Sequence, residues 1–264
     1  MKDKICIFNA ESDATAIELN VCDADVTINR ATDSTLSVTL PVAKNVNAGS
    51  DKGTLYVSQT KRPPLFSRRQ KIEISVPEHI VPALRLNARH CNISVEGGIY
   101  GEVNMICESG TIRIENTDAE SVEINGGRLD IDVESSTLKG SLYINARTAE
   151  FLAQNTFAGL AVVRTRKGNM GIVALNTKEC TLETDDGNIT ATLKGKREDF
   201  CLKTTEKAGN TVADGCLKSK NFNAYTAKGS IVVDFIEDER AADELAFADE
   251  GQNANLSEEE NKAS

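Results

Sequence analysis

A turn followed by an alternating run of apolar and polar residues recurs along this chain from about residue 84 onward. In each copy a polar or glycine-containing turn precedes a stretch in which every second side chain is apolar. Strict alternation places those apolar side chains on one face of a β-strand. The clearest copies are ESGTIRIEN at 108–116, NGGRLDIDV at 125–133, DDGNITATL at 185–193 and AKGSIVVDF at 227–235.

The copies return at an almost constant interval. From residue 84 the chain divides into units of 18 to 21 residues, each with two short alternating strands. One unit cannot bury its apolar face, whereas stacked units bury a continuous one, so a period of about 20 residues predicts a parallel β-solenoid or β-roll. The units are 84–101, 102–120, 121–140, 141–159, 160–179, 180–199, 200–220 and a truncated 221–235.

The alternation also predicts which side chains enter the core. Aromatic residues make up only 5% of the chain and Trp is absent, so Ile, Val, Leu and Ala must fill a narrow, regular interior. In the first strands the inward residues are Leu84, Leu86, Val103, Met105, Val122, Ile124, Leu142, Ile144, Ala161, Val163, Phe200 and Leu202. In the second strands they are Ile93, Val95, Ile112, Ile114, Leu129, Ile131, Val133, Ala149, Phe151, Ala153, Met170, Ile172, Ile189, Ala191, Leu193, Ile231, Val233 and Phe235.

Residues 1–82 alternate in the same way but without the period. Pro77 and Pro82 mark a break after these runs, because proline cannot donate a ladder hydrogen bond. We expect 1–82 to form a strand region that pairs antiparallel and caps one end of the solenoid of residues 83–236, in one continuous fold. The last residues, 237–264, hold ten acids and two bases with little apolar area, which predicts an acidic disordered tail.

Charge and cysteine usage limit the classes of partner and site. The net charge is −10, of which the tail carries −8, so the body is close to neutral and a broad nucleic-acid surface is not expected. Seven cysteines without a C-x-x-C pair do not match zinc spacing and predict small core residues in a reducing compartment, or in an anaerobic one where thiols survive. We expect no metal and no cofactor. The start lacks an apolar segment of secretory length, and no stretch could span a membrane, which predicts a cytoplasmic protein.

Asp130, Asp132 and Glu134 form a dense row of carboxylates. Such a row could bind calcium, as in β-helix polysaccharide lyases, because calcium prefers several hard oxygen ligands. The same residues alternate with inward Leu129 and Ile131, however, and alternation demands polar groups there. We favour the polar outer face of a strand.

The common catalytic motifs are absent from the sequence: no nucleophile elbow, zinc-protease helix, P-loop or dinucleotide fingerprint is present. TDDGN at 184–188 could form a metal loop or a glycosidase pair of carboxylates, but Asp-Gly is a strong turn signal, so we favour a turn. His90 and Cys91 are adjacent, so alternation sends them to opposite faces and argues against a dyad. We therefore predict no catalytic residues and no enzymatic activity.

Three asparagines, Asn87, Asn125 and Asn145, occupy matching positions in their units. Stacked amides can hydrogen-bond along a solenoid, which would make this row structural. Ile106 and Arg164 interrupt it.

The segment KRPPLFSRRQK at 61–71 is the most unusual connection. A basic loop with an apolar tip could contact anionic lipid or a phosphate-bearing polymer. It could also be a hairpin connection with solvated flanks, or the docking site of the acidic tail. The predicted binding residues are Lys61, Arg62, Phe66, Arg68, Arg69 and Lys71.

KIEISVP followed by coils such as ESGTIRIEN, GGRLDIDV, DDGNITATL and AKGSIVVDF resembles the bacterial putative-adhesin β-repeat family, a β-solenoid domain of unknown function. The resemblance covers about residues 15–236. It implies a right-handed β-roll and a role in cell-envelope or surface interaction, and it supplies no catalytic residues. The pattern departs from the family at ARTAEFLAQ, 146–154, which lacks the turn glycine, and at KAGNTVADG, 207–215, which is shifted by one residue.

We expect a non-enzymatic β-solenoid scaffold or interaction protein, adhesin-like and associated with the cell envelope if the resemblance extends to location. One alternative is a carbohydrate-binding or carbohydrate-active β-helix protein. Another is a membrane-associated regulatory or envelope-stress partner. The expected partners are a protein or an envelope polymer, an anionic membrane through 61–71, or a second copy paired end to end or by edges. Attention therefore falls on the residues that break the repeat, 61–71 and 147–155.

Overall fold

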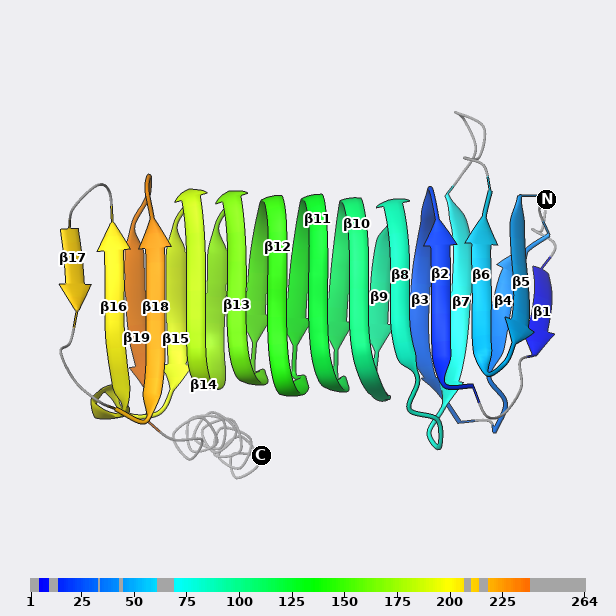
Figure 1. Ribbon diagram of the computed structural model, residues 1–264, viewed down its shortest axis with the longest axis horizontal. Helices are drawn as coiled ribbons and strands as arrows, with labels where there is room; N and C mark the ends of the chain where they lie inside the picture. Colours follow the sequence, from blue (N-terminus) through cyan, green and yellow to red (C-terminus); the bar gives the residue numbers. More distant parts are fainter. Residues whose placement is uncertain are drawn as a thin grey trace, which may run out of the picture.

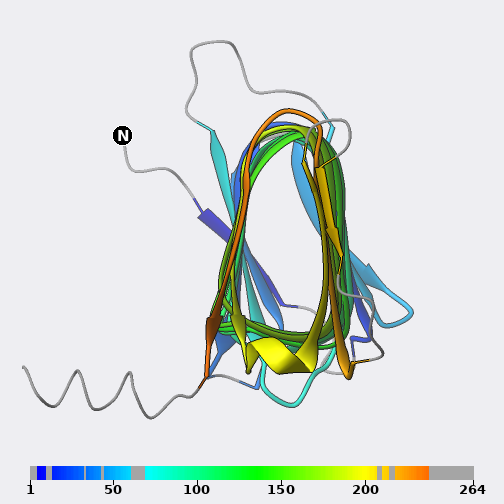
Figure 2. The ribbon, with the colours of Figure 1, turned by 90° about the vertical axis from the view of Figure 1, so that its left-hand side faces the viewer.

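The alternating runs form β-strands that lie side by side along one long axis (Figure 1). This computed structural model describes residues 5–9, 14–32, 34–42, 45–60, 69–206, 210–213 and 218–237. Viewed down the long axis, the coils overlay as a narrow oval with two broad flattened sides (Figure 2). The fold is all-β, as predicted, and its one helical element in the described ranges is the short 3₁₀ turn η1 (Arg197–Asp199).

The central coils consist of the five strands β10 (Ile99–Glu115), β11 (Asp118–Glu134), β12 (Thr137–Gln154), β13 (Phe157–Lys167) and β14 (Met170–Asp186). All but β13 run along one side of the oval, bend at the rim and continue along the other. The first halves of β10, β11 and β12 form what we call the first sheet, and their second halves form the second sheet. β13 and the second half of β14 extend the first sheet, and the first half of β14 extends the second.

Parallel pairing keeps like positions stacked along the axis. In the first sheet Val122 pairs with both Val103 and Leu142. In the second sheet Ile131 pairs with Ile112, 19 residues earlier, and with Phe151, 20 residues later. Stacked rows of this kind remove apolar surface from water at about 25 cal/mol per Å². The inward residues predicted between residues 84 and 200 are all buried, which confirms the assignment of the core.

The N-terminal strands add two further parallel coils, and these do not follow chain order. The strands of these two coils are β2 (Ala16–Val21), β3 (Ala24–Ala31), β6 (Thr54–Gln59) and β7 (Gln70–Pro77). They stack on the coil formed by β8 (Ala83–His90) and β9 (Asn92–Glu96). The coil β2–β3 lies between β6–β7 and β8–β9 and pairs in parallel with both. The expected antiparallel pairing therefore does not hold for these strands, because the inward rows of β2 and β3 match those of β8 and β9 and extend the same core.

Short strands pair antiparallel at the N-terminal end of the coils. The strands involved are β1 (Ile5–Asn9), β4 (Ser37–Pro41) and β5 (Val46–Asp51). β4 pairs with β7 and β1, and β5 pairs with β6. β4 and β5 thus pair with the outermost parallel strands, whose backbone groups would otherwise lack ladder partners, and β1 pairs with β4 in turn.

The order of the coils is also changed at the C-terminal end. The strands there are β15 (Ile189–Lys194), β16 (Phe200–Glu206), β17 (Asn210–Ala213), β18 (Lys220–Thr226) and β19 (Ile231–Ile236). β18 pairs with β14 and β19 pairs with β15, so 221–235 stacks directly on the coil of 180–199. β16 lies beyond β18, and β17 folds back antiparallel on β16 (Figure 1).

The sequence division is therefore wrong in taking 200–220 as a coil that precedes 221–235. Residues 200–213 provide strands for the first sheet alone, so they can close one side of the end but cannot continue both sheets. Among the described strands β19 has only β15 as a partner, which explains why Ile231, Val233 and Phe235 are only partly buried.

The two rims of the oval use different turns. At the rim between the first and second sheets, Gly110 and Gly168 have φ of 142° and 126°. At the opposite rim, Asn116, Ser135 and Asn155 have φ near 50° and each precedes a buried hydroxyl residue. The hydroxyls of Thr117, Ser136 and Thr156 donate to carbonyls two residues earlier, at 3.0, 2.8 and 2.8 Å. This second turn was not predicted, although an Asn/Ser–Thr/Ser pair recurs at 116–117, 135–136 and 155–156.

Candidate functional site

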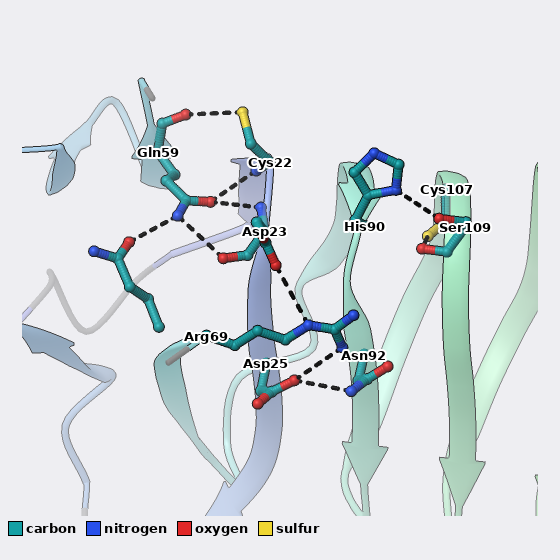
Figure 3. A network of polar contacts seen from close by, with 10 residues as sticks. Cys22, Asp23, Asp25, Gln59, Arg69, His90, Asn92, Cys107 and Ser109 are labelled. Atoms are coloured by element: carbon teal, nitrogen blue, oxygen red, sulfur yellow. Dashed lines mark hydrogen bonds and ion pairs between the residues drawn. The ribbon is translucent and has the colours of Figure 1, made fainter. Parts of the chain in front are cut away.

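Most of the predicted basic loop lies outside the described residues, namely Lys61, Arg62, Phe66 and Arg68. Lys71 is exposed on β7. The Arg69 guanidinium forms ion pairs with Asp23 (Nε to Oδ1, 3.3 Å) and Asp25 (Nη1 to Oδ1, 3.6 Å) (Figure 3). Arg69 is thus engaged within the protein, and binding by the loop stays a prediction.

The contacts around Arg69 connect the out-of-order N-terminal coils. The buried Gln59 side chain accepts hydrogen bonds from the backbone N–H groups of Cys22 and Asp23, at 2.8 and 2.9 Å. Its amide donates to the Asp23 carbonyl and to Gln70. Asn92 donates to the Asp25 carboxylate at 2.9 Å (Figure 3). These bonds satisfy buried polar groups and join β2–β3 to their neighbours on both sides, which makes the network structural.

The cysteines of the described core are packing residues. Cys91, Cys107 and Cys180 are buried free thiols, as predicted. Burial is the main cause that raises the pKa of each of these thiols, and for Cys107 it raises the pKa to about 11. His90 contacts Ser109 on the next coil, with 2.6 Å between Nδ1 and Oγ (Figure 3). Because a buried thiol with a raised pKa is a poor nucleophile, these residues do not form a catalytic pair.

The predicted carboxylate row lies on the outward face of the second sheet. Asp130 is exposed, and Asp132 and Glu134 are half-buried. Arg113 on β10 ion-pairs with Glu134 at 3.3 Å. Desolvation raises the pKa of Asp132, and the Arg113 guanidinium opposes that shift. Within the described ranges no group of three His, Cys, Asp or Glu side chains could hold a metal ion.

A shallow hollow does include part of this row. It is lined by Asp130, Asp132 and Glu150, with Gly171 and the buried Phe151 beneath them. A carbohydrate-active site of the kind considered above would present an aromatic ring to the sugar. Phe151 is the one aromatic residue lining this hollow and is only 3% exposed, so the hollow offers no stacking surface.

A second hollow lies on the first sheet, and we call it the arginine groove. Its volume is about 460 Å³, within the range of about 300–1,000 Å³ typical of ligand sites. Gly126 and Ala146 are the small residues of its lining. The polar side chains that line it are Asn125, Asn145, Arg147, Arg164, Thr165, Arg166, Glu183, Asp185 and Tyr225.

The strand register places these side chains in rows. Asn145 pairs with Asn125 on one side and with Arg164 on the other, and the row continues through Glu183 to Tyr225. The strand register therefore aligns Asn125 with Asn145 as predicted, and Arg164 interrupts the row of asparagines as expected. Asn125 donates to Glu123 at 2.7 Å.

The arginines of the groove differ in their partners. Arg164 donates to the Glu183 carboxylate at 2.7 Å and to the Tyr143 hydroxyl at 3.5 Å. The hydrogen bond to Glu183 is the main cause that raises the pKa of Arg164. Arg147 and Arg166 are exposed, and no described acid lies within ion-pair distance of either. The groove therefore presents two guanidinium groups without ion pairs beside amide, hydroxyl and carboxylate groups.

Sequence reasoning did not predict the arginine groove. Arg147 falls in 147–155, one of the two segments noted for breaking the repeat, so the sequence did indicate one residue of the groove. Arg166 and Tyr225 become neighbours of Arg147 only through the parallel register and the reordered C-terminal coil.

The fold defines the class of protein as a parallel β-solenoid with two flat faces of different polar character. The chain belongs to the Toastrack DUF4097 family, whose profile matches residues 14–239. The resemblance inferred from the repeated motifs is thereby confirmed. No curated protein matches the chain.

Solved structures that match the chain carry names related to adhesion or lipid binding. A putative adhesin from Bacteroides fragilis has a TM-score of 0.51 and 14% identity, covering 88% of this chain and 97% of that chain. A putative lipid binding protein from Parabacteroides distasonis has a TM-score of 0.42 and 11% identity, covering 89% and 98%. A putative cell adhesion protein from Clostridium sporogenes has a TM-score of 0.31 and 13% identity, covering 89% and 100%. The similarity to the Bacteroides fragilis protein shows a shared fold.

In the described part of the chain, no helix is long and apolar enough to span a membrane.

Proposed function

We propose that this protein is a non-enzymatic, adhesin-like recognition scaffold that acts at the cell envelope. The observation that carries the proposal is the parallel register, which presents outward side chains in straight rows across consecutive strands of a flat sheet. Neighbouring strands lie about 4.8 Å apart, so such rows suit an extended ligand or surface better than a small enclosed substrate.

The proposal includes right-handed winding with coils of about 20 residues. Crossover connections between parallel strands are right-handed in about 98% of cases. The envelope location is supported by the name of the Bacteroides fragilis protein that shares the fold.

Fractionation of cells that express the native protein tests the proposal. We expect the protein to be recovered with the envelope fraction and to be released from it by salt, because polar and charged rows make contacts that salt screens. Recovery from the cytosol alone, with no binding of the purified protein to isolated envelopes, would contradict the proposal.

A further inference from the structure

Five basic residues gather on three consecutive strands of a chain whose net charge is −10. Arg128 lies on β11, Arg147 on β12, and Arg164, Arg166 and Lys167 on β13. The register pairs Arg128 with Thr148 and Thr148 with Lys167. It also pairs Ala146 with Thr165, so Arg147 and Arg166 occupy equivalent positions on adjacent strands.

This cluster contributes little to folding through ion pairs. Of its five members only Arg164 has an ion-pair partner among the described residues, namely Glu183. Like charges on adjacent strands destabilise a sheet, and Arg147 lies beside Arg166. On its other side Arg166 is level with Asp185 on β14, but no ion pair forms between them. A concentration of unpaired guanidinium groups on a rigid sheet is better explained by a ligand that carries negative charge.

Two kinds of group in the groove identify that ligand more closely. Guanidinium groups bind carboxylates through two parallel hydrogen bonds. Glu183 and Asp185 line the same groove and can only accept hydrogen bonds when ionised. Glu183 already accepts one from Arg164, and the remaining acceptor positions of the two carboxylates suit ligand groups that donate. A polymer that carries both carboxylates and hydroxyls satisfies both requirements, whereas a uniformly anionic surface would be repelled by the two acids.

Side chains suited to sugar hydroxyls flank the arginines. Asn145 and Tyr225 are exposed along the same row, and Tyr143 is half-exposed beside Arg164. Amides donate and accept hydrogen bonds, and a Tyr side chain combines an apolar ring with a polar hydroxyl.

We propose that the arginine groove binds a carboxylated polysaccharide, with the sugar chain running along the solenoid axis from β11 towards β18. Arg147 and Arg166 bind its carboxylates, and Asn145, Glu183 and Tyr225 bind its hydroxyls. This assignment rests on the proposed recognition function and names the chemistry of its ligand.

Titration calorimetry of the full chain with polygalacturonate, a polymer of carboxylated sugars, tests the assignment. We expect binding that weakens as salt concentration rises. The Arg147→Gln/Arg166→Gln variant should bind at least about tenfold more weakly, because it loses two charge-assisted contacts. Both side chains are exposed and removing them relieves a like-charge contact, so the variant should unfold at a temperature no lower than that of the parent chain.

The matched control is Arg30→Gln/Arg85→Gln. It removes the same two charges from exposed arginines that pair with Glu78 and Glu18, away from the groove. We expect this variant to bind polygalacturonate as the parent chain does. A loss of affinity equal to that of the groove variant would overturn the assignment, because net charge rather than the groove would then determine binding.

Two further comparisons separate the ligand from other anions. Fully methyl-esterified polygalacturonate lacks the carboxylates and should not bind. Binding to phosphatidylglycerol vesicles without binding to the polymer would overturn the assignment, as would failure to bind polygalacturonate at all. If the protein still fractionates with the envelope in those cases, the recognition scaffold stands and only the ligand class is wrong.

Discussion

The first and second sheets can be compared within a single strand, because β11 contributes to both. In the first sheet its inward residues are Val122 and Ile124, and in the second they are Leu129 and Ile131. The outward residues beside them differ in kind. On the first sheet β11 leads into the arginine groove through Asn125, whereas on the second it presents Asp130 and Asp132.

The comparison shows that stacking fixes the inward positions of both sheets but leaves the outward ones free. An inward residue contacts its counterparts on the coils before and after, so each coil restricts the next. An outward residue has no such restriction. The two faces can therefore acquire different chemistry without changing the fold, and recognition need involve only one of them.

The largest expected effect tests the equivalence of the two interiors. Ile144→Ala in the first sheet and Ile131→Ala in the second remove side chains that are 0% and 1% exposed. Each should lower the free energy of unfolding by about 2–5 kcal/mol, because a cavity remains. Urea denaturation of both variants measures the cost, with exposed Thr190→Ala as a control expected within about 0.5 kcal/mol of the parent chain. A large loss of stability in only one of the two variants would contradict the prediction that the interiors of the two sheets are equivalent.

A smaller effect is expected at the rim that joins the two sheets. A Cβ added at Gly168 would lie 1.9 Å from the Ala149 carbonyl oxygen, and φ there is 126°. Gly168→Ala should therefore lower the free energy of unfolding by more than about 1 kcal/mol.

Gly49→Ala is the matched control for this rim, because a Cβ there meets no atom within 4 Å. It should be neutral or stabilise the protein by up to about 1 kcal/mol. Calorimetric melting of both variants decides the matter. Equal changes in stability for Gly168→Ala and Gly49→Ala would show that the close approach of the two coils is not the reason why this rim needs glycine.

The smallest expected effect concerns the outward face of the second sheet. Burial raises the pKa of Asp132 in the folded protein above its unfolded value. Between these two pKa values the folded state binds more protons than the unfolded state. Stability from this carboxyl is present below the unfolded pKa and is lost as pH rises through the folded pKa. Asp132→Asn should then raise Tm at pH 7 by no more than about 2 °C, and by less at pH 4.

Asp130→Asn, on the exposed position two residues earlier in β11, is the control for Asp132→Asn. It should show no such difference between the two pH values. The same pH dependence in both variants would contradict the explanation by burial.

The sequence predicted what each coil does by itself and failed where coils meet. Alternation was sufficient to assign Val103, Ile112 and their counterparts to the core, because inward position is a local property of a strand. The placement of β2 against β8 joins residues 67 apart, and no local pattern encodes it.

The groove could not be read from the sequence for the same reason. Arg147 and Arg166 occupy polar positions that look like ordinary solvated surface until the register makes them neighbours. Tyr225 joins them only because β18 stacks directly on β14 and the intervening residues 200–213 are displaced to the end of the solenoid.

The central claim is that the two faces are alike inside and that only the first sheet binds the ligand. Chemical modification of arginines by phenylglyoxal, read by mass spectrometry with and without polygalacturonate, tests it most directly. We predict that the polymer protects Arg147 and Arg166 on the first sheet and leaves the modification of Arg113 on the second sheet unchanged. Protection of Arg113 with no protection of Arg147 and Arg166 would contradict the account.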